Sequence, residues 1–581
     1  MDSLLEHITR LRTFLFVVFA ISVLFACRLK GVTCLASRKA QLAFASSLLR
    51  SHSTKGILTS ENMFKRAIYG SIIHSKSPQD LEIIKEGAII YDGNTGVILE
   101  DLFVGTLENL KASDIVAEDN ILDYTGKIII PGFVDAHCHA PQYVFSGTGM
   151  DLPLLQWLEK YTFPCESQFQ DNDFARYGFE KSIKRHLKCG TTFSSYFGTL
   201  HNSACKILVD IINEVGQRAF VGKVSMDRNS PDFYIENTST GCCDAEEFVK
   251  HVLNQTETGR NFVNRVETLE QEKILTGSPA SVIDMMHLSK CDTDSDSSSD
   301  IINNQETLLN SPETPLVMPV ITPRFVPTCT PEMMSFLGGL SIKYGLPVQS
   351  HMSESVNEIA WVKSLHPDQQ SYAEVYEVYN LLHPRAYMAH CCHSSDEEIE
   401  VIKRTKSGVV HCANSNFMLS SGIMDVRRFI SEGIPVALGT DVAGGYSPSM
   451  LDAIRQTLIA SQAKSFEHKL VDNIKQENLD FVSEAEGYEP ISYQEAFYMA
   501  TVGGASVLGM GDVIGNFTTG KKVDCLVLDV EAPGTPIDIF EGEDVSEKFQ
   551  KFLFNGDDRN IDTVFVDGKI VLEGMKFIGH G

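Results

Sequence analysis

Two histidines separated by one residue are the first candidates for chemistry in this sequence. His137 and His139 flank Cys138, shortly after an apolar run and Pro131-Gly132. Residues two apart in an extended segment point to the same side, so the two imidazoles can converge on one metal ion. We expect Cys138 to point the other way. Taken alone the spacing is a weak signal, because two unrelated surface histidines would show the same pattern.

Metal-ligating residue types recur where other apolar runs end. His351, His390 and Asp441 each stand at or just after the end of such a run. In a parallel β/α fold the active site lies at the carboxyl ends of the strands. Histidine and carboxylate are good zinc ligands, and a catalytic zinc keeps a position for water. The joint arrangement predicts one metal site, although His351 alone could be a capping histidine and Asp441 alone could form an Asx turn.

A carboxylate follows one of these candidate ligands. Glu354 comes three residues after His351 and is our candidate for moving protons above the metal. The alternative is a carboxylate that stabilises a helix N-terminus through the helix dipole. His393 and His411 are left out of the site, because His393 lies beyond its strand end and His411 lies within the seventh strand.

The elements that must position these residues alternate between strand and helix. Continuous apolar strands separated by helices, such as those expected at 173–187, 203–215 and 331–344, are typical of a parallel (β/α)8 barrel of the TIM type. We assign the barrel to residues 131–509. The expected strands are 127–130, 191–197, 219–224, 316–322, 346–350, 386–389, 408–412 and 435–438.

The two ends of the chain have a different texture. Residues 63–130 and 510–581 contain short β-rich runs, with a hairpin signal at 92–96. We expect them to form one small β-sandwich domain built from both termini.

Two segments stand outside this plan. Residues 230–314 are expected to be a disordered insertion, because 291–300 is acidic and serine-rich and cannot bury enough apolar surface to offset its ordering entropy. Residues 1–62 form an N-terminal extension with an apolar segment at 14–27. That segment is shorter than the roughly 20 residues that span a bilayer. It suits a signal or anchor as well as a non-native extension.

Charge and cysteine content limit the function classes. The formal net charge of −27 should repel phosphate backbones, so nucleic acid is not an expected partner. The 14 cysteines form no C-x-x-C motif, which favours reduced thiols and a cytoplasmic protein. The same absence excludes the zinc deaminases that carry H-x-E with P-C-x-x-C.

The strand-end motifs carry a family resemblance. Pro131-Gly132-Phe133-Val134-Asp135-Ala136-His137-Cys138-His139, with 351–354 and 439–441, resembles the signatures of the amidohydrolase superfamily. Within that superfamily the chain resembles the guanine deaminases, from about Met63 to the C-terminus apart from the insertion. The stretches that carry this second resemblance are 142–143, 151–158, 161–164, 322–325, 441–445 and 556–561.

The resemblance implies roles for particular residues. One zinc ion per subunit would be held by His137, His139, His351 and Asp441, and the absence of lysine from 316–325 favours a single metal. Glu354, Asp441 and His390 would be the catalytic groups. The residues expected at the purine are Gln142, Arg324, Phe325, His351 and Asp441.

The resemblance also implies a reaction and a quaternary state. Zinc would lower the pKa of a bound water to about 7, and the products of guanine would be xanthine and ammonia. Arg324 would present its planar donor fork to O6 and N7 of guanine, unless it forms a rim salt bridge instead. A homodimer is expected. The alternatives are a related enzyme acting on another amino-purine, a pterin or a triazine, and a scaffold protein that uses this fold.

Overall fold

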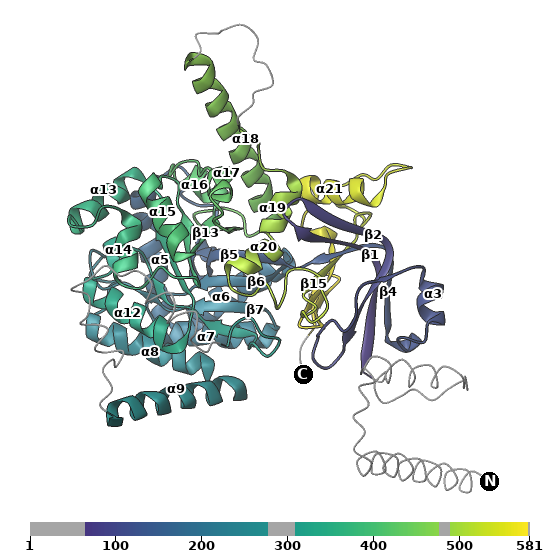
Figure 1. Ribbon diagram of the computed structural model, residues 1–581, viewed down its shortest axis with the longest axis horizontal. Helices are drawn as coiled ribbons and strands as arrows, with labels where there is room; N and C mark the ends of the chain where they lie inside the picture. Colours follow the sequence, from purple (N-terminus) through teal and green to yellow (C-terminus); the bar gives the residue numbers. More distant parts are fainter. Residues whose placement is uncertain (1–63, 277–307, 476–487, 579–581) are drawn as a thin grey trace, which may run out of the picture. The chain divides into compact units, whose positions relative to one another are not determined.

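Figure 1 shows the computed structural model of the 581-residue chain. It describes residues 64–276, 308–475 and 488–578. The expected extension 1–62, with its apolar segment, and the acidic stretch 291–300 lie outside the described residues. Among the residues that are described, no helix combines the length and the apolar character needed to cross a bilayer.

Eight strands form two four-stranded parallel sheets, in chain order. The first sheet contains β5 (Phe133–His139), β6 (Thr191–Phe197), β7 (Arg218–Gly222) and β9 (Val317–Pro319). The second contains β11 (Val348–Met352), β12 (Ala386–His390), β13 (Gly408–His411) and β14 (Val436–Leu438).

Backbone hydrogen bonds connect the edges of these two sheets on both sides. Beyond β14, the N–H of Asp441 donates to the carbonyl of His137 in β5 over 2.9 Å. At the other edge, the N–H of Gln349 in β11 donates to the carbonyl of Ile321 over 2.9 Å, just beyond β9. The order of the parallel strands therefore follows the order of the sequence from β5 round to β14.

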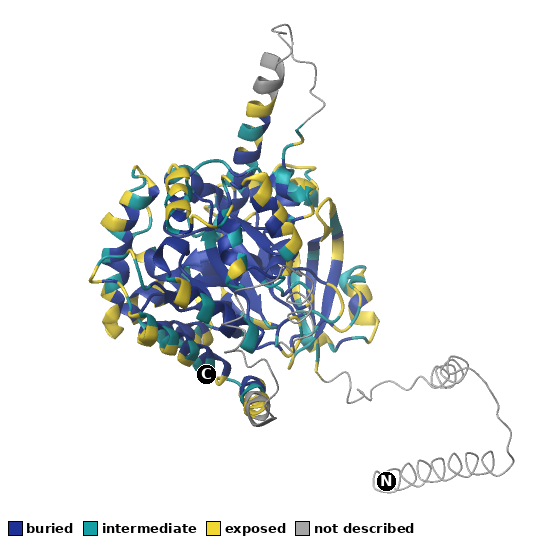
Figure 2. Ribbon diagram, turned by 60° about the vertical axis from the view of Figure 1, so that its left-hand side comes forward, coloured by how far each residue is buried: buried dark blue, intermediate teal, exposed yellow. Residues whose placement is uncertain are grey.

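Helices cover the outside of the parallel strands (Figure 1). The three expected helices are present as α6 (Asn172–Lys188), α7 (Asn202–Val215) and α12 (Pro331–Tyr344). In α7 the apolar residues recur at helical spacing and are buried, and Gly216 ends the helix with a left-handed φ of 75°. Figure 2 shows the strands buried in the interior while the outer faces of the helices are exposed.

One expected barrel strand belongs elsewhere. Residues 127–130 are part of β4 (Ile121–Pro131), which pairs with β1 (Lys65–Ser77) and β15 (Cys525–Leu528) rather than with the parallel strands. The His137–His139 segment lies in the separate strand β5, so the histidines end a strand of their own. An apolar run shows that a strand is buried, but it does not show which sheet it joins.

The strands from the two termini form a single hydrogen-bonded sheet. Its order is β18-β17-β16-β15-β4-β1-β2-β3, so the expected sandwich is not present as two separate sheets. Antiparallel pairing of β15 with β4 joins the C-terminal strands to the N-terminal ones edge to edge. The other strands of this sheet are β2 (Asp80–Asp92), β3 (Phe103–Val104), β16 (Ile561–Val566), β17 (Lys569–Glu573) and β18 (Lys576–Phe577). Two short strands, β8 (Val224–Ser225) and β10 (Thr322–Pro323), form a separate parallel pair.

A buried ion pair links this sheet to the parallel strands. Arg218, at the start of β7, donates from Nε to Asp524 Oδ2 over 2.8 Å and from Nη2 to Asp524 Oδ1 over 3.1 Å. Arg218 and Asp524 are 2% and 3% exposed. Asp567 lies 3.5 Å from the same guanidinium. A buried Arg–carboxylate pair costs desolvation, and this bidentate geometry is what offsets that cost.

The expected disordered insertion is wrong over its first part. Helices α8 (Thr238–Leu253) and α9 (Glu257–Thr276) occupy much of 230–314, and only 277–307 lie outside the described residues. Helix α8 buries Phe248, Val249, Val252 and Leu253 on one face. This apolar face provides the burial that the acidic stretch lacks. The acidic composition of 291–300 therefore does not describe the residues that precede it.

Candidate active site

The ends of β5, β11 and β14 bring four candidate ligands together. His139 Nε2 lies 3.1 Å from His351 Nε2 and 3.3 Å from Asp441 Oδ1. His137 Nε2 lies 3.2 Å from the same carboxylate oxygen. The group His137, His351, His390 and Asp441 can also offer atoms that all lie within 4.8 Å of one another. The structure thus clusters every metal candidate of the sequence, with His390 beside them.

The arrangement fits a metal cation. Two nitrogens bound at about 2.0–2.1 Å to a tetrahedral zinc lie roughly 3.3 Å apart, close to the separations seen here. His351 Nδ1 is 2.7 Å from the carbonyl oxygen of Arg324 and donates to it, so the Nε2 lone pair points into the cluster. The Nε2 atoms of His137 and His390 are buried without a hydrogen-bond partner among the described residues. A cation would supply what these facing lone pairs lack.

The electrostatics of the cluster favour ligands in their binding forms. Burial lowers the pKa of His139 to about 4 and the pKa of His351 well below its usual range, so both imidazoles are neutral. Burial works to raise the pKa of Asp441, but His137 and His139 more than offset it and hold that pKa well below its usual range. Neutral imidazoles and an ionised carboxylate are the forms that bind a metal.

Glu354 points into the site rather than capping a helix. Helix α13 (Val356–Leu365) is capped by Ser355 and Glu358, which form a capping box, and this leaves the side chain of Glu354 free of that role. Its Oε1 accepts a hydrogen bond from Ser421 Oγ over 2.7 Å. Burial, and then the charge of Asp441, raises the pKa of Glu354 to about 8.

His390 lies between the two carboxylates of the site. Its Nε2 is 3.5 Å from Glu354 Oε2 and 3.7 Å from Asp441 Oδ2. Its Nδ1 is 2.8 Å from Asn416 Oδ1, which holds the ring with Nε2 toward the carboxylates. His390 and Asp441 both have left-handed backbones, with φ of 75° and 46°. Non-glycine residues with such φ values carry strain that is common at functional sites.

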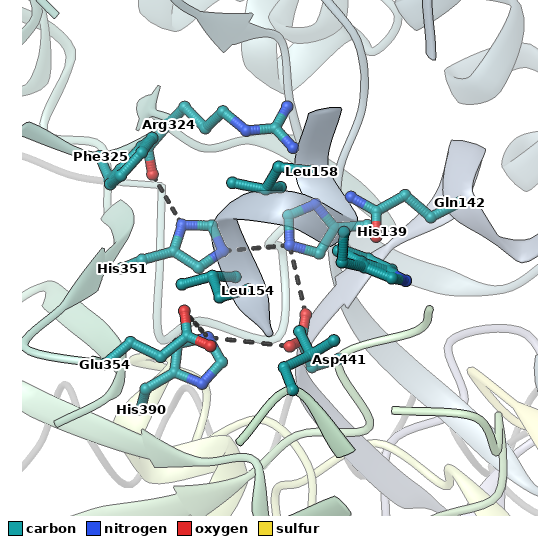
Figure 3. A pocket seen from close by; sticks show the side chains of 12 residues that line it. His139, Gln142, Leu154, Leu158, Arg324, Phe325, His351, Glu354, His390 and Asp441 are labelled. Carbon is teal, nitrogen blue, oxygen red and sulfur yellow. Dashed lines mark hydrogen bonds and ion pairs between the residues drawn. The ribbon is translucent and has the colours of Figure 1, made fainter. Parts of the chain in front are cut away.

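A pocket opens beside this cluster. In Figure 3, Glu354, His390 and Asp441 lie below the central histidines His139 and His351. Arg324 lies above them, and Gln142 lies beside His139. Leu154, Trp157, Leu158, Phe325 and Leu419 complete the lining. His137 lies deeper and is 1% exposed. A wall that combines apolar side chains with several hydrogen-bonding groups suits a small planar heterocycle.

Arg324 differs from the sequence expectation. Its Nη1 and Nη2 donate to the Glu166 carboxylate over 2.6 and 3.3 Å, so part of the fork is already paired. The pair is not at the rim either, because Arg324 is 2% and Glu166 0% exposed. A guanidinium has five N–H donors, and those that Glu166 does not use remain for a ligand. Sequence reasoning missed Glu166, whose only signal was its place two residues beyond the matching stretch 161–164.

Cys138 points away from the cluster, as expected. Its Sγ lies 3.2 Å from Nε2 of His186 in α6, on the opposite face of β5. The neighbouring Asp135 was also missed. Its carboxylate accepts hydrogen bonds from the N–H and Oγ1 of Thr440 and so fixes the turn that carries Asp441.

Comparison with known proteins agrees with this geometry. The family model described as the amidohydrolase family matches residues 128–571. The chain belongs to the amidohydrolase family. Among curated proteins, the guanine deaminase of Dictyostelium discoideum is 38% identical over 87% of this chain and 98% of its own length. The human guanine deaminase is 35% identical over 87% and 96%. The resemblance to guanine deaminases expected from the motifs is confirmed.

Solved structures give the same result. A guanine deaminase from C. acetobutylicum, with guanine bound in its active site, matches with a TM-score of 0.68 and 34% identity over 87% of this chain and all of its own. The E. coli guanine deaminase matches with a TM-score of 0.67 and 28% identity over 87% of this chain and 99% of its own. The superfamily fold is a TIM barrel, and this member has mixed α/β content.

Proposed function

We propose that this protein is a guanine deaminase, which hydrolyses guanine to xanthine and ammonia. The observation that carries the proposal is that one pocket is lined by Glu354 and the histidine–aspartate cluster together with Gln142 and Arg324. Relatives named as guanine deaminases, at 35–38% identity over nearly their whole length, support the same reaction.

We propose one zinc ion per subunit, held by His137, His139, His351 and Asp441. Nitrogen and carboxylate donors at the observed separations support zinc over a hard cation such as magnesium. When bound, the metal would supply a water of lowered pKa at neutral pH. The hydrogen bond from His351 to the Arg324 carbonyl fixes the orientation of the His351 ring, with Nε2 directed toward the proposed metal position.

Glu354 is the residue that moves protons. A carboxyl whose pKa lies at about 8 can both take up and give up a proton near neutral pH, as a general base and general acid must. Glu354 takes one proton from the attacking water and delivers it to a ring nitrogen. It then moves the remaining proton from the hydroxyl added at C2 to the amine, which leaves as ammonia when the C2–N bond breaks. His390 and Asp441 orient the water, and Ser421 keeps the Glu354 carboxylate aimed at it.

The far side of the pocket recognises the purine. The remaining N–H groups of Gln142 and Arg324 suit the O6 and N7 acceptors of guanine, and Phe325 provides an apolar wall. Adenine presents an amino group at C6, which would place donor against donor. A buried donor left without a partner costs about 1–3 kcal/mol, and this disfavours adenine.

Three broader features belong to the same proposal. The hydrogen bonds at both edges of the parallel sheets support one closed (β/α)8 barrel. The exposed apolar side chains of Ile459 and Phe466 on α18 (Met450–Lys475) support contact between two copies in a homodimer. The free thiols among the described cysteines support a cytoplasmic location.

Ammonia release from purified protein tests the proposal directly. We expect rapid release from guanine and much slower release from adenine, 8-oxoguanine, pterins and amino-triazines, with zinc as the bound metal in elemental analysis. A protein that carries the metal but prefers another of these amines would belong to a different branch of the family. A metal-loaded protein that releases no ammonia from any of them would refute an enzymatic role. Light scattering of the same sample reads the oligomeric state.

A further inference from the structure

Glu166 lies behind the pocket wall and touches both side chains that face the purine. It belongs to α5 (Phe163–Ser167), is fully buried and does not line the pocket. Its Oε2 accepts a hydrogen bond from Arg324 Nη1 over 2.6 Å. Its Oε1 accepts from Gln142 Nε2 over 2.8 Å and from Arg324 Nη2 over 3.3 Å. One carboxylate thus holds two recognition groups at once.

These contacts determine which way the Gln142 amide points. Its Oε1 accepts from the backbone N–H of Ala443 over 3.1 Å, while its Nε2 donates to Glu166. A flipped amide would face a donor with its NH2 and a carboxylate with its oxygen, and both contacts would be repulsive. The amide therefore has one N–H left to offer, while its oxygen is turned toward Ala443.

The same helix also restrains the plane of Arg324. The ring centroid of Phe163, three residues before Glu166, lies 5.2 Å from Arg324 Cζ. Phe163 contacts the guanidinium and Glu166 accepts hydrogen bonds from its terminal nitrogens. Helix α5 therefore restrains both the plane of the guanidinium and the direction of its N–H groups. The stretch 161–164, which resembles the family, includes Phe163 and ends two residues before Glu166, so it contains one of the two residues that contact Arg324.

We propose that Glu166 is a positioning residue that makes this pocket select a purine by a carbonyl-bearing edge. It holds Gln142 and Arg324 so that both turn N–H donors toward the ligand. The inference rests on the proposed function, because it concerns the same pocket and the same substrate.

The charge of Glu166 balances the charge of Arg324. Arg324 is 2% exposed, and a buried guanidinium with no counter-charge would attract an anion into the pocket. Paired with Glu166 it contributes donors without net charge, which suits a neutral heterocycle. Burial works to raise the pKa of Glu166, but Arg324 offsets it and holds that pKa below its usual range. The carboxylate is therefore ionised and accepts from every partner.

The test compares two substrates that share the leaving amine and differ at C6. Guanine has O6, whereas 2-aminopurine has only hydrogen there. In Glu166→Gln the side chain keeps its length but replaces one acceptor oxygen by an NH2, which opposes a donor of Arg324 or Gln142. We expect the ratio of kcat/KM for guanine over 2-aminopurine to fall at least about tenfold in this variant, since only guanine has the O6 acceptor that the misaligned donors would bind.

A matched control removes a similar pair elsewhere. Arg427 and Glu495 form a bidentate ion pair of 2.8 and 3.0 Å, and neither residue lines the pocket. Glu495→Gln should leave the substrate ratio unchanged. If Glu166→Gln does not fold, Glu166→Asp keeps the charge but is one methylene shorter and cannot reach both partners. It should lower the same ratio by a smaller factor.

The outcomes separate the inference from the proposed function. If the wild-type protein deaminates guanine and Glu166→Gln loses activity on both substrates by the same factor, Glu166 is only structural and the inference is overturned. If the wild-type protein does not deaminate guanine at all, the proposed function fails first. Metal content and melting temperature, measured on each variant, show whether the metal cluster and the fold are intact.

Discussion

The Glu354 carboxylate faces the His390 imidazole, with Oε2 3.5 Å from Nε2, from the ends of two adjacent parallel strands. The hydrogen bond from Ser421 to Glu354 and the contact of His390 with Asn416 hold the two groups in this position. The proposed proton carrier and the histidine proposed to orient the water are thus held in place by contacts within the protein. Such preorganisation is a large part of how a site lowers an activation barrier.

Replacing Glu354 tests its role in moving protons. Glu354→Gln keeps the size of the side chain and an oxygen for Ser421, but it cannot take up or release a proton near neutral pH. We expect kcat on guanine to fall about 10²–10⁴-fold with the metal retained, as measured by ammonia release and elemental analysis. Glu432→Gln, on the exposed surface, serves as the control. A loss of less than tenfold would assign the proton transfer to another group.

Removing a metal ligand should have two effects together. His351→Ala takes away one Nε2 of the cluster, so we expect the bound metal to fall from one equivalent to a small fraction and activity to fall with it. His468→Ala is the matched control, because that histidine lies on α18 outside the pocket. Chelation of the wild-type protein should abolish activity, and added zinc should restore it. Full metal content in His351→Ala would show that the ligand set is wrong.

Stability should fall in acid because of a buried neutral histidine. His383 Nδ1 accepts a hydrogen bond from the N–H of Arg385, so the neutral ring carries its proton on Nε2 and donates it to Ser341 Oγ. Burial, and then the charge of Arg385, lowers the pKa of His383 from 6.5 to about 3. The unfolded chain thus takes up a proton that the folded one does not. The stabilisation is complete above pH 6.5 and is lost as the pH falls toward 3.

His383→Gln measures this contribution. Urea unfolding of metal-free protein, followed as the pH is lowered below 6.5, should show a shallower loss of unfolding free energy in the variant than in the wild-type protein. His468→Ala should keep the wild-type slope. Equal slopes for all three proteins would mean that His383 is protonated in the folded state.

The ion pair between Arg218 and Asp524 should contribute strongly to stability. Asp524→Asn leaves the guanidinium buried, with only the contact of 3.5 Å to Asp567 in compensation. We expect a loss of about 3–5 kcal/mol in the free energy of unfolding, measured with urea. Glu432→Gln breaks the exposed pair with Lys403 and should cause no measurable change. A small loss in Asp524→Asn would show that water or Asp567 replaces the missing charge.

Local sequence patterns predicted most of the elements that carry the site. The periodicity of α7 and the apolar runs of β12 and β14 mark a helix and two strands, because burial of one face or of both imposes that spacing. The positions of His351, His390 and Asp441 at strand ends predicted one cluster. Parallel strands bring their carboxyl ends to the same edge, so this inference needs no tertiary detail.

Pairing partners could not be predicted in the same way. The run at 127–130 is as apolar as a barrel strand, yet β4 pairs with β15, nearly 400 residues further along the chain. The choice of neighbour depends on which edge is vacant once the rest of the sheet has formed. No local pattern contains that information.

The family, and the histidine and aspartate residues proposed as metal ligands at strand ends, could be read from the sequence alone. Only the tertiary structure showed that Arg324 is paired, because its partner Glu166 lies 158 residues away on a short helix. A lone arginine in a sequence has five free donors, and the fold decides which of them a buried carboxylate uses. The proposed discrimination among purines depends on the donors that remain, and these are set by burial and geometry rather than by residue type.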